Sequence, residues 1–173
     1  MHYVSWDRAD REAPVLLVEE GPDALAKFTH ERAELTSGEV WDLVTTPEGG
    51  AVATQDGREV VRADGSLRRD KQIPVTVDGS RQYVMVAETS KNWIIDDAAG
   101  QKVGQFTSDH NGVRRAILEF EGETQLAPVD IVALAWASRL VLEARKMTNS
   151  TALIAFLVLL SVFIVVVWFI GPR

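Results

Sequence analysis

Residues 151–170, TALIAFLVLLSVFIVVVWFI, constrain this chain most, because they form a long apolar run without a single charge. At about 1.5 Å per residue, a helix of about twenty residues crosses about 30 Å of hydrocarbon. Ser161 is one hydroxyl in the middle of the run, and Trp168 lies near its far end, where an aromatic residue at the membrane interface is expected. The sequence therefore predicts a transmembrane helix over 151–170, with Phe156, Phe163 and Trp168 among its apolar residues.

The place of this run predicts a topology. Residues 171–173 follow it as a short C-terminal tip, and the N-terminal stretch MHYVSWDRADREAP has no apolar signal-peptide core. Arg145 and Lys146 on the near side outnumber Arg173 on the far side, and cytoplasmic flanks carry the excess of positive charge. We expect a single-pass, tail-anchored membrane protein with its N-terminal domain in the cytoplasm, its C-terminus on the opposite side and residues 147–150 as a linker.

Charge and composition limit the class of protein to which the residues outside the predicted span can belong. About 150 residues lie outside the predicted span, enough for one domain with a single core. The formal net charge is −7, and because Arg173 is the one charge after Lys146, the part before the span carries −8. This acidic excess argues against nucleic acid as a partner and works against a polybasic grip on anionic lipid. The predicted span, rather than the charge, implies membrane lipid and other membrane proteins as partners. The chain has no cysteine, which excludes disulfides, thiolate metal ligands and a cysteine nucleophile.

Turn signals predict a β-rich domain over residues 15–146, preceded by a polar N-terminal arm over 1–14. Short β-rich runs alternate with turn pairs, among them Asp56-Gly57, Asp64-Gly65 and Asp78-Gly79. Such pairs supply the positive φ angles of tight hairpins, and their spacing of about eight to fourteen residues is typical of an antiparallel meander. We count eight or nine clear strands in a curled sheet or barrel. Residues 23–35 fit either a strand pair or one short helix.

A hydrophobic helix is predicted over residues 128–146. Pro128 suits the first turn, and the following VDIVALAWASRLVL is apolar almost all the way round, with Asp130, Ser138 and Arg139 as interruptions. Such a helix should be enclosed by the sheet, although packing on one sheet face is the alternative. The residues that would fill the barrel are Ile131, Leu134 and Trp136, with Ala133, Ala135 and Ala137 letting the walls come close.

Two segments resemble the superfamily of tubby C-terminal, LURP-one and phospholipid scramblase domains. Residues 93–104, WIIDDAAGQKVG, are similar to its strand, Asp-x-x-Gly turn and strand ending in Val-Gly, and residues 130–137, DIVALAWA, are similar to its barrel-filling helix. The resemblance covers residues 38–146 and implies an antiparallel barrel threaded by that helix. The family has twelve strands, more than we count, and the scramblase-type cysteine cluster and acidic calcium segment are absent here.

Catalytic signatures are missing from the sequence. It contains no nucleophile elbow, Walker loop, dinucleotide glycine fingerprint or zinc-binding H-E-x-x-H. Asp109 and His110 sit in SDHNG, which a hairpin turn explains better than a metal or acid-base pair. Asp96 and Asp97 would point to opposite sides of a strand. We therefore expect no enzyme activity, no catalytic residues, no cofactor and no metal site.

Positive charge concentrates at Arg68, Arg69 and Lys71 and again at Arg114 and Arg115. The family resemblance implies that such loops contact lipid headgroups or an acidic partner, and a solvated loop is the alternative. Each cation facing an anionic membrane would add about 1 kcal/mol of attraction.

Two functions follow as hypotheses. The first is a non-enzymatic binding or scaffold module held at the membrane, an accessory subunit of a membrane complex such as a respiratory assembly. The second is a scramblase-like protein that binds or translocates phospholipid.

Overall fold

The computed structural model of the protein describes residues 1–46, 48–89, 91–107 and 117–170. Within the C-terminal helix, the side chains of residues 147–153, 155, 165–167, 169 and 170 are outside that description.

The described residues form twelve strands that close into one antiparallel barrel. Each strand pairs with its neighbours in the sequence, and the first pairs with the last through Tyr3 opposite Glu119, which closes the ring. The strands are β1 (Tyr3–Asp7), β2 (Val15–Val18), β3 (Ala24–Phe28), β4 (Arg32–Leu35), β5 (Val40–Thr46), β6 (Gly50–Gln55), β7 (Arg58–Asp64), β8 (Gln72–Val77), β9 (Arg81–Ala87), β10 (Asn92–Asp97), β11 (Lys102–Thr107) and β12 (Ile117–Phe120).

The hairpins form where the sequence places residues that tolerate positive φ. Asp56 and Gly57 turn between β6 and β7 with φ of 50° and 78°, and Asp78 and Gly79 turn between β8 and β9 with φ of 48° and 67°. Gly50 opens β6 at a φ of 96°, where a Cβ would come 2.1 Å from the carbonyl oxygen of Ala63 on β7. Only glycine fits there, because both the backbone angle and the approach of β7 exclude a side chain.

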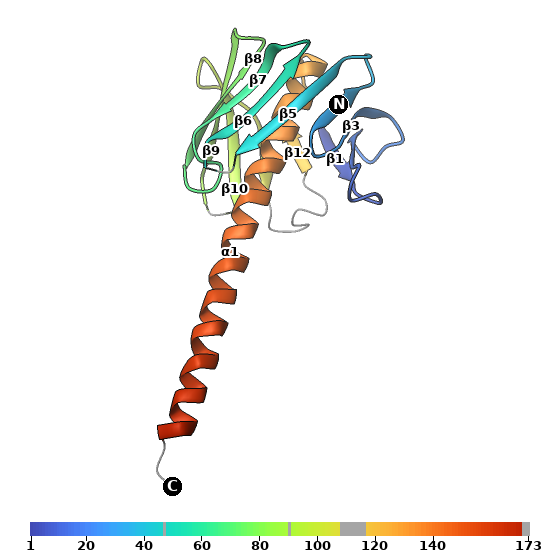
Figure 1. Ribbon diagram of the computed structural model, residues 1–173. Helices are drawn as coiled ribbons and strands as arrows, with labels where there is room; N and C mark the ends of the chain where they lie inside the picture. The colour runs from blue at the N-terminus through green and yellow to red at the C-terminus, as the bar shows by residue number, and fades with distance from the viewer. Residues whose placement is uncertain (47, 90, 108–116, 171–173) are drawn as a thin grey trace.

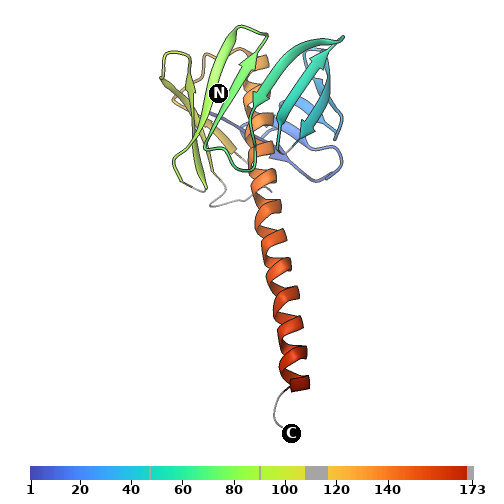
Figure 2. The same cartoon turned by 60° about the vertical axis from the view of Figure 1, so that its left-hand side comes forward.

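The single helix of the described residues, α1 (Pro128–Ile170), passes through the barrel and continues beyond it. Figure 2 shows strands on either side of its first half after the molecule is turned by 60°, in agreement with Figure 1. Residues 131–138 are all at most 3 % exposed, and α1 packs against β3, β8 and β12, which are spread around the ring. The expectation of a helix enclosed by strands is therefore confirmed, and packing on one sheet face is excluded.

Side-chain size explains how the helix fits. Ala133, Ala135 and Ala137 are at most 1 % exposed and keep parts of α1 slim, while Leu134 and Trp136 fill the remaining width at 0 % and 3 % exposure. From the wall, alternate residues point inward, as in β5, where Trp41 is fully buried while Val40 and Val44 are exposed. Helix and wall together form one continuous core.

Three expectations need correction. Tyr3–Asp7 is not part of a loose arm, because β1 pairs with both β2 and β12 and is needed to close the ring. The count of eight or nine strands was too low, since residues 24–35 form the strand pair β3 and β4 rather than one short helix, and the N-terminal residues supply β1. Residues 147–150 are not a break between two helices, because α1 runs through them without interruption.

Candidate functional site at the exit end of the barrel

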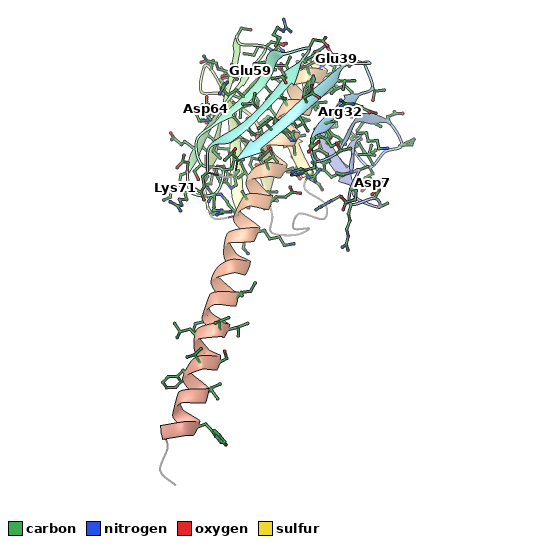
Figure 3. The ribbon with its side chains drawn as sticks, in the orientation of Figure 1. Asp7, Arg32, Glu39, Glu59, Asp64 and Lys71 are labelled. Carbon is green, nitrogen blue, oxygen red and sulfur yellow. The ribbon has the colours of Figure 1, made fainter. Side chains whose placement is uncertain are left out.

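The two ends of the barrel differ in their relation to α1. We call the end at which α1 begins the entry end, and the end from which it leaves the exit end. Lys71 and Asp7 lie at the exit end, whereas Glu39 and Glu59 lie at the other (Figure 3). Nine of the described Lys and Arg residues lie on the exit-end connections or on the part of α1 that emerges there: Arg8, Arg11, Arg68, Arg69, Lys71, Lys91, Arg139, Arg145 and Lys146.

The predicted basic loop is at this end, between β7 and β8. The guanidinium of Arg68 lies 3.0 Å from a carboxylate oxygen of Glu48, and that of Arg69 lies 3.7 Å from the other. Within the loop, Asp70 accepts a hydrogen bond of 2.7 Å from the backbone N–H of Ser66, which fixes the turn. Lys71 is exposed at the barrel edge. Carboxylates thus balance part of the positive charge of this loop.

Arg145 adds a further cation beside the loop as α1 leaves the barrel. Its guanidinium lies 4.6 Å from the centre of the Trp93 ring and donates a 2.5 Å hydrogen bond to the backbone carbonyl of Asp70. Burial lowers its pKa, against the raising effect of the Asp70 carboxylate. Arg68, Arg69, Lys71 and Arg145 thus lie together with Glu48 and Asp70, a group of four cations and two carboxylates.

A second arginine of α1 is held against the wall one turn and a half earlier. Arg139 lies 4.8 Å from the centre of the Trp6 ring on β1, and its Nε is 2.9 Å from a carboxylate oxygen of Glu143. The same oxygen lies 3.7 Å from Arg8. Arg139 is one of the interruptions noted in the helix sequence, and the structure explains it: the charge is stacked and paired at the mouth rather than in the core.

A crevice of about 410 Å³ opens at the exit end between α1 and the barrel wall. Its deep part is apolar, lined by Phe28 of β3, Leu67 of the β7–β8 loop and Trp136 of α1, all at most 3 % exposed. Thr45, at the end of β5, lines its mouth and is exposed. We call this hollow the exit crevice. It offers apolar walls at depth and polar groups at the opening.

A second hollow, of about 790 Å³, lies on the outer side of β1 and β2. Its lining includes the cations Arg8, Arg11 and Lys146 and the carboxylates of Asp7 and Glu20. Arg11 lines this outer groove and the exit crevice as well, so the two hollows share one cationic side chain.

The entry end carries a buried carboxylate, that of Asp130 in the first turn of α1. Asp130 is 2 % exposed and accepts hydrogen bonds from Arg81 Nε at 2.7 Å and from the Tyr83 hydroxyl at 3.1 Å. Arg81 also donates to Asp78 at 2.8 Å. Burial, together with the negative charge of Asp130, raises the pKa of Tyr83 to about 12. The hydrogen bond to Asp130 raises the pKa of Arg81, so both partners stay protonated at neutral pH.

Other residues singled out from the sequence fall on a segment that the structure does not describe. Arg114, Arg115, Asp109 and His110 lie outside the described residues. In the described part of the chain, no three His, Asp or Glu side chains are grouped so that they would hold a metal ion. Sequence reasoning did not identify the Arg145–Trp93 stack or the Asp130 network. The signal that points to both is a charged residue in a helix that is otherwise apolar.

The continuation of α1 beyond the barrel presents apolar side chains to its surroundings. Phe156 is 60 % exposed, Phe163 62 % and Trp168 79 %. Among the described residues, no helical stretch combines the length and the apolar character of a membrane span.

Comparison with known proteins adds no relative: no family model, curated protein or solved structure matches this chain. The resemblance to the tubby, LURP-one and scramblase superfamily stays a prediction that rests on residues 93–104 and 130–137.

Proposed function

We propose that this protein is a non-enzymatic binding module that α1 anchors in a membrane, with the barrel on the cytoplasmic side. The observation that carries the proposal is the helix itself, which is enclosed by the barrel over residues 131–138 and exposes apolar side chains farther on. One helix would thus lie partly in the protein core and partly in the lipid.

The free energy of transfer from water favours insertion of the exposed part of α1 into a membrane. The full sequence of residues 151–170 is free of charge, although the described side chains cover it only in part. Leu, Ile, Val and Phe each contribute about 0.3–0.6 kcal/mol to insertion at the centre of a span, so the run sums to several kcal/mol. In water, the exposed Phe156, Leu159 and Phe163 would form a patch that soluble proteins rarely tolerate.

The exit end of the barrel would then face the membrane. Arg145 and Lys146 are separated from the apolar run only by residues 147–150 and would lie at headgroup depth on the cytoplasmic side. Arg68, Arg69 and Lys71 surround the same opening and would attract anionic lipid or an acidic partner protein, at about 1 kcal/mol per cation near the surface. Glu48 and Asp70 reduce this attraction, so the loop supports anchoring rather than replacing α1.

A pair of charged substitutions tests the anchor in the full-length chain. Leu159→Arg together with Phe163→Arg places two charges near the centre of the run, at a cost of about 2.5–3.5 kcal/mol each. We expect the double variant to be extracted from vesicles by alkaline carbonate, while the wild type and the Ser161→Ala control remain in the membrane. A double variant that resists extraction as well as the wild type would refute the anchor.

A binding role, rather than a free-standing membrane domain, predicts a stoichiometric partner such as a subunit of a respiratory or transport complex. Purification in mild detergent followed by identification of co-purifying proteins tests it, and a protein that is always recovered alone would count against this part of the proposal.

A second candidate function, the binding or transfer of phospholipid, is favoured by the exit crevice, because its apolar walls open beside the proposed membrane surface. Faster lipid flip-flop in reconstituted vesicles would support transfer, and an unchanged rate would exclude it.

A further inference from the structure

The exit crevice has the chemistry of an amphiphile site. Its deep walls come from three separate elements and consist of Phe28, Leu67 and Trp136, which are 1 %, 0 % and 3 % exposed. A volume of about 410 Å³ is within the range of small-ligand pockets, which are typically apolar with a few polar groups that orient the ligand. An apolar chain would therefore gain burial there without needing polar partners at depth.

Two of the four charged side chains that line the crevice, Arg139 and Glu143, are paired with each other at 2.9 Å, which limits what the deep part would accept. The other two, Arg11 and Glu12, are exposed. Arg139 is also stacked on Trp6. A charged group that entered the deep part would lose hydration and find this pair already neutralised. The deep walls of the crevice therefore favour a hydrocarbon chain over a charged group.

The opening offers a different environment. Arg11 lines the mouth of the exit crevice and also the outer groove, where Arg8 and Lys146 are the other cations. A molecule with its chain in the crevice would place its polar end beside this shared arginine. Of the charged side chains that line the outer groove, three are cationic and two, Asp7 and Glu20, are acidic, so the groove favours an anionic end.

From this arrangement we propose that the exit crevice binds one acyl chain of an anionic membrane lipid, with Arg11 contacting the headgroup. The proposal rests on the proposed function, because the crevice opens where α1 would enter the bilayer. Ala144, at the crevice, and Ile154, on the exposed apolar part, are ten residues apart on one helix, a rise of about 15 Å. The exposed apolar part of α1 is thus about 15 Å from the crevice along the helix axis.

Photocrosslinking of the full-length protein in vesicles tests the site. The probe is phosphatidylglycerol with a diazirine at the end of one acyl chain, and the adducts are located by peptide mass spectrometry. We expect adducts on two separate regions, the bilayer run 151–170 and the crevice residues of α1 from Trp136 to Ala144. The same probe built on phosphatidylcholine should label the crevice much less and the bilayer run equally.

Two matched substitutions on β5 identify the entry path. Thr45 lines the crevice mouth, whereas its neighbour Thr46 does not, and both side chains are exposed. Thr45→Trp should close the mouth and reduce crevice adducts about tenfold, equivalent to about 1.4 kcal/mol, while Thr46→Trp should leave them unchanged. Circular dichroism of both variants checks that the barrel is folded. Arg11→Gln, which leaves the apolar walls intact, should remove the preference for phosphatidylglycerol.

The outcomes separate this proposal from the one on which it rests. Adducts on 151–170 without adducts on the crevice would overturn the acyl-chain site and leave the membrane anchor standing. Absence of adducts from both regions would overturn both. Equal crevice labelling by the two lipids would refute the role of Arg11, and equal labelling of Thr45→Trp and Thr46→Trp would refute the site.

Discussion

Replacement of Asp130 by alanine should destabilise the barrel more than any other single charge removal at the entry end. Its carboxylate is the buried acceptor for both Arg81 and Tyr83, at 2.7 and 3.1 Å, in the first turn of α1. Without it, the Tyr83 hydroxyl loses its acceptor at 6 % exposure, which costs about 1–3 kcal/mol.

The other interactions that Asp130→Ala removes contribute less to the free energy of unfolding. Arg81 is 39 % exposed in its side chain, so solvent screening holds its share to about 1 kcal/mol or less. A negative charge in the first helical turn contributes about 0.3–1 kcal/mol more. The total is about 3 kcal/mol, which for a chain of this size lowers the melting temperature by roughly 6–12 °C.

Unfolding of the full-length protein in detergent by urea, followed by fluorescence of the buried Trp41, Trp93 and Trp136, measures the loss. Asp78→Asn is the control, because Asp78 also pairs with Arg81 but is more exposed, and asparagine tolerates the positive φ of this turn position, so the loss should be less than about 1 kcal/mol. In a Tyr83→Phe background, the cost of Asp130→Ala should fall by about 1 kcal/mol or more. Equal losses for Asp130→Ala and Asp78→Asn would show that burial of the Asp130 carboxylate is not the cause.

Two further predictions concern stability. Because the pKa of Tyr83 is raised in the folded barrel from 10.0 to about 12, its stabilising contribution is complete below pH 10 and is lost as the pH rises toward 12; Tyr83→Phe should flatten this alkaline decline, and an identical decline in both proteins would contradict it. Gly50→Ala should cost several kcal/mol because its Cβ would meet the Ala63 oxygen at 2.1 Å, whereas Gly57→Ala, also at positive φ but with nothing within 4 Å, should cost about 1 kcal/mol; equal losses in urea unfolding would show that the close approach of β7 is not the cause.

The sequence predicts those parts of the fold that depend on local signals. Asp56-Gly57 and Asp78-Gly79 mark hairpins because they supply positive φ by themselves, and the helix that follows Pro128 is recognisable because it is apolar on every side. β1 was missed because YVSWD reads as a polar arm until it is paired with β12, more than a hundred residues away. Residues 3–7 form a strand because they close the ring, and this long-range pairing leaves no signal in the local sequence.

The candidate site was predictable only in part for the same reason. Arg68, Arg69 and Lys71 form a run in the sequence, and they were identified as a basic loop. Arg145 and Trp93 are 52 residues apart and meet only because α1 leaves the barrel beside β10. The exit crevice has no sequence signature at all, since its walls come from β3, the β7–β8 loop and α1.

We propose that α1 leads from the core of a closed barrel directly into a bilayer, and site-directed spin labels can test this. The chain has no cysteine, so single nitroxide labels can be placed at Ser161→Cys on the exposed part of α1 and at Ser37→Cys on the entry-end connection between β4 and β5. In vesicles, we expect oxygen, but not a water-soluble nickel complex, to relax the label at position 161, and we expect the nickel complex to relax the label at position 37. Relaxation of position 161 by the nickel complex to the same degree as position 37 would contradict it.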